Sequence, residues 1–173
     1  MSILKKMLIG IGMALAVING STVFAFGTIH FTGEITEQAC TVDSSSKDLH
    51  VDLGKISSKN LSVQGELAGL KDFTIKLTDC PENSAVTVRF GGNRDPNDQD
   101  LLAINSVEGA AKNVGIAIFE KDAVSQIKLY DDSKEIIFTS ANIDLDYTAR
   151  YKATGVVTAG SANSSAVYSV QYQ

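Results

Sequence analysis

The sequence has little of the chemistry that enzymes use. Among its 173 residues there is no tryptophan, and there are only two histidines, two cysteines and two prolines. It has no CxxC pair, no HExxH or GxSxG motif and no glycine-rich phosphate loop. Because metal and nucleophile sites need several such groups at set spacings, these absences argue against a metalloenzyme, a hydrolase and a nucleotide-binding enzyme. We therefore expect no catalytic residue, no metal site and no cofactor.

Long hydrophobic runs are also missing, apart from one near the N-terminus. Met7–Ile18 is apolar and uncharged, and it follows Lys5 and Lys6. Its length of about a dozen residues falls short of the roughly 20 that a transmembrane helix needs. Val23-Phe24-Ala25 then places small residues at positions −3 and −1 of a cleavage site. This order of features predicts a signal peptide over residues 1–25, and hence export.

Positive charge is scarce. The chain has 15 basic and 20 acidic residues, a formal net charge of −5. Cleavage after residue 25 would remove two lysines and no acidic residue, which changes the net charge to −7. An acidic chain repels nucleic acid and anionic membrane surfaces, so we expect no nucleic-acid partner and no direct membrane insertion. The remaining 148 residues are enough for one domain with a hydrophobic core.

The two cysteines, Cys40 and Cys80, both follow the predicted cleavage site. In an exported chain an even number of cysteines favours a disulfide over free thiols. The alternative is a pair of buried thiols that act as small apolar side chains. A zinc or redox site is disfavoured, because no histidine flanks either cysteine.

Short runs rich in β-branched and aromatic residues dominate the mature sequence, and clusters of Gly, Asn, Asp and Ser separate them. This pattern predicts an antiparallel sandwich rather than parallel βαβ units. Helix is scarce, with a turn or two predicted over Ser58–Ala68 and Ser106–Ala111. Strands are predicted at Thr28–Ile35, Cys40–Val42, His50–Asp52, Asp72–Thr78, Ala85–Phe90, Leu101–Ile104, Val114–Phe119, Gln126–Lys128, Ile136–Phe138, Asp146–Val157 and Ala166–Gln171.

Three polar stretches have simpler explanations than a functional site. Asp95–Asp100 begins like a calcium loop, but its sixth residue is Asp100 instead of glycine and its twelfth is Ser106 instead of glutamate. We interpret it as a solvated turn. The stretch from Asp131 to Glu135 is interpreted as a hairpin turn, and Ser44–Lys47 as a serine-rich loop.

The start of the mature chain alternates in polarity. Gly27, Ile29, Phe31, Gly33 and Ile35 share one face of a strand, and the polar residues between them share the other. A glycine inside a strand usually marks a bulge or the close approach of another group. The alternation alone favours an edge strand packed on its own domain over a strand packed elsewhere.

Several segments resemble type 1 fimbrial subunits of the chaperone/usher pathway. The similar segments are Gly27–Ile35, Ala39–Asp43, Leu77–Pro81, Asn113–Ile116 and Ala149–Gly155. Gly160, the fourteenth residue from the C-terminus, and the penultimate Tyr172 complete the pattern. The resemblance covers essentially the whole mature chain.

The resemblance implies an all-β fold, an incomplete immunoglobulin-like antiparallel β-sandwich that lacks its final strand and is completed by a donor strand. It implies a signal peptide over 1–25, an N-terminal donor-strand extension over 26–38 and a pilin domain over 39–173. The expected function is that of a structural subunit of a bacterial fimbria, which polymerises by donor-strand exchange after chaperone-assisted export. The expected partners are neighbouring pilus subunits, a periplasmic chaperone and an outer-membrane usher, and the expected location is the extracellular fimbrium.

In this family the donor strand fills pockets of a groove on a neighbouring subunit. Carried over to this sequence, Ile29, Phe31 and Ile35 fill the pockets. Gly33 lies where the groove leaves no room for a side chain. Gly27 stands where related subunits often carry a larger apolar residue, so its contact is expected to be weak or absent.

On the acceptor side, the resemblance places Tyr168, Val170 and Tyr172 in one wall of the groove. The terminal carboxylate of Gln173 is expected to bind basic residues of the chaperone. Gly160 is expected to contribute to the same chaperone and groove contacts. The simpler explanations are an ordinary strand-end aromatic for Tyr172 and an ordinary loop glycine for Gly160.

Two other roles within the family fit less well. A tip-associated receptor-binding, adhesin-like subunit carries an extra lectin domain, for which 148 mature residues leave no room. An assembly-terminating minor subunit would lack a usable donor strand, whereas the alternation before Cys40 is clear.

Overall fold

The computed structural model of the protein describes residues 27–33 and 39–172. The chain divides into two units, residues 1–35 and residues 36–173. In the first unit, residues 27–33 form neither helix nor strand. The signal peptide predicted over 1–25, together with Ile35 and Gln173, lies outside the described residues. The roles predicted for these residues stay predictions.

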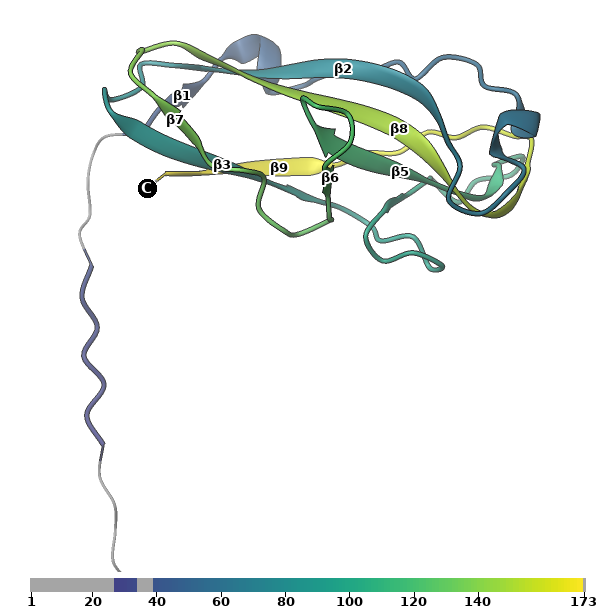
Figure 1. Ribbon diagram of the computed structural model, residues 1–173, viewed down its shortest axis with the longest axis horizontal. Coiled ribbons are helices and arrows are strands. Elements are labelled where there is room, and N and C mark those ends of the chain that lie inside the picture. Colours follow the sequence, from purple (N-terminus) through teal and green to yellow (C-terminus); the bar gives the residue numbers. More distant parts are fainter. Residues whose placement is uncertain (1–26, 34–38, 173) are drawn as a thin grey trace, which may run out of the picture. The chain divides into compact units, whose positions relative to one another are not determined.

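Two antiparallel sheets form the second unit (Figure 1). The larger sheet has the strand order β1-β2-β8-β5-β4, and β6 also pairs with β5. Its centre consists of the long strands β2 and β8, whose register aligns Phe73 with Tyr147 and Ile75 with Leu145. The strands of this sheet are β1 (Thr41–Val42), β2 (Leu67–Thr78), β4 (Leu102–Ala103), β5 (Lys112–Glu120), β6 (Gln126–Ile127) and β8 (Ile143–Thr158).

The smaller sheet has the strand order β7-β3-β9. Its strands are β3 (Ser84–Gly91), β7 (Ile136–Phe138) and β9 (Val167–Tyr172). β9 runs antiparallel to β3, with Val88 opposite Val170. Figure 1 shows β9, in yellow, beside β3, in teal. β9 is therefore an edge strand of this sheet.

The core lies between the two sheets, because buried side chains of β2 and β8 in the larger sheet form one hydrophobic cluster with those of β3 in the smaller sheet. Phe73, Phe90 and Tyr147 meet there with ring centroids 5.1 to 6.1 Å apart. Such aromatic contacts contribute about 0.5–1.5 kcal/mol beyond the area that they bury. A disulfide joins Cys40, before β1, to Cys80, after β2, as the sequence predicts.

Most predicted strands are present within a few residues, but the strand predicted at His50–Asp52 is not. No strand occurs between β1 and β2 among the described residues, because nothing there pairs with this stretch. Residues 27–33 of the predicted strand Thr28–Ile35 also form no strand. Both stretches have the alternation of a strand without a partner.

Of the two short helical predictions, one is met in part and the other is wrong. Within Ser58–Ala68 only one 3₁₀ turn forms, η2 (Ser58–Leu61), because β2 already begins at Leu67 and pairs with β8. Ser106–Ala111 forms a turn, since Gly109 has a φ of +74°, which a right-handed helix does not allow. Within residues 27–33 and 39–172, no helix is long and apolar enough to cross a membrane.

Candidate functional site: an unpaired edge beside β9

β9 has a hydrogen-bonding partner on one side only. It pairs with β3, and no strand among the described residues pairs with its other edge. The core-facing side chains Tyr168, Val170 and Tyr172 are half-buried and pack against the main hydrophobic cluster. An edge strand with exposed backbone groups and apolar side chains is a template for pairing with another chain.

A second unpaired stretch, residues 48–56, leads from β1 toward β2. Within the described part of the chain, no backbone–backbone hydrogen bond involves its N–H or C=O groups. Its side chains alternate, because Leu49, Val51 and Leu53 are half-buried while His50 and Asp52 are exposed. Buried or half-buried backbone groups normally have partners, so this stretch has the side-chain pattern of a strand and lacks the ladder.

Three observations place the chain from Cys40 to Ile56 alongside β9 and the segment that precedes it, in the opposite direction. The Tyr172 hydroxyl donates to the Cys40 carbonyl at 3.1 Å, and the Tyr168 hydroxyl donates to the Ser46 carbonyl at 2.7 Å. Farther along, Gly54–Ile56 and Val157–Asn163 line one hollow. The first two contacts are made by the hydroxyl groups at the ends of tyrosine side chains, and not by backbone pairing. We call the free edge of β9 together with residues 48–56 the open edge.

The chain from Cys40 to Ser46 is held in place from both sides. Ser46 is almost fully buried, and its hydroxyl accepts a hydrogen bond from the Lys76 amide of β2 at 2.8 Å. The Asp43 carboxylate caps the short 3₁₀ helix η1 (Ser44–Ser46). Burial raises the pKa of both Tyr168 and Tyr172, which keeps the two hydroxyls protonated as donors. The tyrosines therefore set the distance between β9 and this segment.

A hollow of about 330 Å³ lies at the end of the open edge, where the chain enters β9. Most of its lining is apolar or small. The side chains include Ile56, Leu61, Val114, Tyr151, Val157 and Ala162. Lys55, Asn163 and several serine and threonine residues share the lining, so the hollow is mixed in polarity.

Gly160 belongs to the lining of this hollow and has a clear local role. The next residue, Ser161, forms a parallel β-bridge with Ala110. A Cβ at Gly160 would overlap the backbone of Gly109, Ala110 and Ala111. The glycine is needed for this close backbone approach. Its predicted contact with a chaperone stays a prediction.

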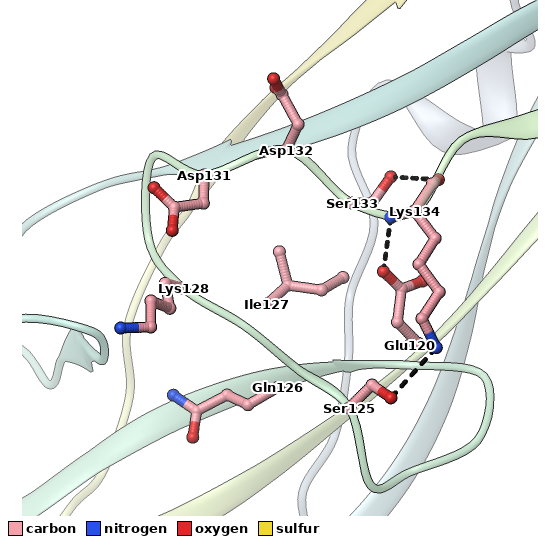
Figure 2. Close-up of a pocket in the computed structure, with 9 residues that line it drawn as sticks. All are labelled: Glu120, Ser125, Gln126, Ile127, Lys128, Asp131, Asp132, Ser133 and Lys134. Carbon is pink, nitrogen blue, oxygen red and sulfur yellow. Dashed lines mark hydrogen bonds between the residues drawn. The ribbon is translucent and has the colours of Figure 1, made fainter.

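A second hollow, shown in Figure 2, is lined mainly by polar residues, and several of them already bond one another. The Lys134 amide donates to the Glu120 carboxylate at 2.7 Å, and the Lys134 ammonium donates to the Ser125 hydroxyl at 3.0 Å. Asp132 forms an ion pair with Arg89, and Lys128 one with Asp100. This network stabilises the loop and leaves few groups for a ligand.

The acidic stretch Asp95–Asp100 is a turn, as interpreted from the sequence. One carboxylate oxygen of Asp95 accepts hydrogen bonds from the amides of Asn97 and Asp98. Asp98 also forms an ion pair with Lys152 at 3.2 Å. These bonds are those of an Asx turn.

The described part of the predicted donor segment presents its apolar side chains to solvent. Ile29 is 76% exposed and Phe31 is 90% exposed. A Cβ added at Gly27 or Gly33 would meet no atom within 4 Å. Large apolar groups that are this exposed mark an interaction surface.

The sequence interpretation missed one half of the open edge. It identified Tyr168, Val170 and Tyr172 on β9, and it took His50–Asp52 for an ordinary strand. The alternation from Leu49 to Leu53 was a usable signal. Nothing in the local sequence indicates, however, that this stretch has no partner.

Comparison with known proteins identifies the class of protein. A family model described as fimbrial protein matches residues 29–173. The chain is 35% identical over 163 residues to the type-1 fimbrial protein A chain of Escherichia coli K12, covering 91% of this chain and 90% of that protein. It is 34% identical over 177 residues to long polar fimbria protein A of Salmonella typhimurium, covering 99% and 98%.

Solved structures agree on the fold. The P pilus rod subunit PapA matches with a TM-score of 0.64 and 19% identity, over 78% of this chain and 99% of that one. A chain from a chaperone–usher pilus structure matches with a TM-score of 0.66 and 20% identity, over 92% of this chain and all of that one. Both support the immunoglobulin-like sandwich predicted from the sequence.

These matches define a pilin, a protein whose role is structural. The chain belongs to the fimbrial protein family, since the family model spans most of its length and full-length relatives exceed 30% identity. It is a structural subunit of a bacterial fimbria, exported to the periplasm and assembled outside the cell.

Proposed function

We propose that this subunit polymerises by donor-strand exchange at the open edge. Residues 26–38 of one copy would add a strand between β9 and residues 48–56 of the next copy. The observation that carries the proposal is the pair of unpaired backbone stretches, each with half-buried apolar side chains on its core side. One inserted strand would satisfy both stretches at once, which is β-strand addition.

The donor side supplies what the open edge lacks. Ile29, Phe31 and Ile35 would pack on the half-buried side chains of the acceptor. Gly33 would lie where the acceptor leaves no room for a side chain. Burying a large apolar side chain contributes roughly 1.5–3 kcal/mol. Three such side chains and a ladder of backbone hydrogen bonds give a junction that dissociates slowly.

The same edge needs protection before assembly. We infer that a periplasmic chaperone first supplies a strand to it, and that the usher is where the exchange takes place. Tyr168, Val170 and Tyr172 would line the occupied site, and the terminal carboxylate of Gln173 would bind basic groups of the chaperone. The exposed edge supports this inference, because such edges otherwise aggregate. The proposed role involves no catalytic residue.

The test replaces Phe31 with aspartate. Phe31→Asp places a charge in the pocket-facing row, and burying an unpaired carboxylate is costly. We expect polymers to be lost while chaperone binding is retained, as measured by heat-sensitive ladders on detergent gels and by co-purification.

Thr32→Asp is the matched control, because it adds the same charge one residue away on the solvent-facing side. Polymerisation should persist in this variant. Fibres of normal yield from Phe31→Asp would contradict the proposal, as would equal loss in both variants.

A further inference from the structure

The solvent-facing side of the open edge is acidic. Along residues 48–52, Asp48, His50 and Asp52 are exposed, while Leu49 and Val51 are half-buried. Neither aspartate forms an ion pair within the described residues. Asp52 accepts one hydrogen bond, from the Gly54 amide at 2.8 Å. We call Asp48, His50 and Asp52 the acidic strip.

The donor segment carries one basic group that can meet this strip. Thr28, His30 and Thr32 alternate with Ile29 and Phe31, and all are exposed. If the apolar row faces the core of a neighbouring copy, His30 faces solvent. In a sheet, residues on one face of neighbouring strands lie side by side, so His30 lies on the same face as the acidic strip.

His30 can pair with an aspartate in every register of the donor segment that places it beside the acidic strip. A shift that keeps the apolar row buried moves the donor by two residues. Cross-strand side chains interact directly opposite and also diagonally, at j±2. If His30 stands opposite Asp48 or Asp52, the pair is direct. If it stands opposite His50, both aspartates are diagonal neighbours.

On this basis, which rests on the donor-strand function proposed above, we propose that His30 of one copy pairs with Asp48 or Asp52 of the next. The pair selects the donor segment and strengthens the junction when the imidazole is protonated. The other neighbour, β9, presents the uncharged Ser169 and Gln171 on this face. Glu34 on the donor repels the strip, and His30 is the basic side chain in the segment's solvent-facing row.

The expected pH dependence follows from the charges. Histidine as a residue type changes charge between about pH 5 and 8, a range in which carboxylates ordinarily keep theirs. The attraction is therefore present at the acidic end and is lost as pH rises. A charge on His50 would oppose the effect in part, but Asp48 and Asp52 flank it in the same strip.

The test measures how fast fibres of the full chain dissociate in urea at low ionic strength, at about pH 5 and about pH 8, because an uncharged denaturant does not screen the charge pair. We expect wild-type fibres to dissociate about two- to fivefold more slowly at the lower pH, the range for an exposed cross-strand charge pair. His30→Gln should remove this ratio. His30→Lys should give slow dissociation at both pH values, because its charge does not change.

Acceptor variants complete the experiment. Asp48→Asn with Asp52→Asn should abolish the pH ratio in fibres that keep His30. His50→Gln is the matched histidine control and should keep or increase the ratio. Loss of the ratio in His50→Gln, or an unchanged ratio in His30→Gln, would overturn the pairing while leaving donor-strand exchange intact. Failure of the wild-type chain to form fibres would instead overturn the proposed function, and the pairing with it.

Discussion

β8 and β9 face the same core, yet they differ in how deeply their side chains are buried and in how many of their backbone edges are hydrogen-bonded. β8 has β2 on one side and β5 on the other, and its core-facing Leu145 and Tyr147 are fully buried. β9 has only β3, and its core-facing Tyr168 and Val170 remain half-buried. The larger sheet is therefore complete around β8, whereas the smaller sheet ends where one more strand would fit. The first region contributes most to stability, and the second is the edge at which we propose assembly.

The largest difference between the two regions should appear when core side chains are truncated. Tyr147→Ala should destabilise the protein by about 3–5 kcal/mol, the usual cost of removing a large aromatic side chain from a core. Tyr168→Ala, the matched change on β9, should cost about 1–2 kcal/mol in the unassembled subunit, because its side chain is only half-buried. Guanidinium unfolding of each purified variant measures both values. Equal costs would contradict the contrast between β8 and β9.

A smaller effect is expected where the chain approaches β9. Gly160→Ala forces a Cβ into the backbone of residues 109–111 and should cost about 1–3 kcal/mol, as overpacking does. Ser165→Ala, at an exposed position of the same loop, is the control and should change stability little. Thermal unfolding of the two variants separates these outcomes. A neutral Gly160→Ala would show that the loop moves aside freely.

The smallest effect concerns the tyrosine hydroxyls beside the open edge. Tyr172→Phe removes the hydrogen bond to the Cys40 carbonyl, and the net loss should be about 1 kcal/mol. Because this hydroxyl holds the Cys40–Ser46 segment near β9, the rate of polymerisation should change more than the final yield. Detergent gels of samples taken at set times measure that rate. An unchanged rate would mean that the disulfide alone positions the segment.

Much of this arrangement can be predicted from the sequence. The signals are local: alternation gives most of the strands, and an even cysteine count in an exported chain gives the disulfide between Cys40 and Cys80. The alternation of Ile29 and Phe31 identifies a strand-like segment. It leaves open where that segment packs, because an edge strand on its own domain has the same pattern. The family resemblance supplied the intermolecular assignment.

The errors come from long-range pairing. The side chains of His50–Asp52 alternate as the sequence predicts, but the stretch pairs with no other strand. Alternation indicates one buried face, and it does not show whether a hydrogen-bonded neighbour is present. The helix predicted over Ser58–Ala68 is cut short for the same kind of reason. There β2 begins at Leu67, because β8 offers a partner.

By itself, the amino-acid sequence determined which stretches are strand-like, which faces are apolar, and which segments belong outside the core, because these properties depend on side chains a few residues apart. Only the tertiary structure decided which strands lack a partner. Whether a backbone edge is satisfied depends on segments more than 100 residues away, as with Ser46 and Tyr168. The open edge between residues 48–56 and β9 is visible only once both sheets are in place.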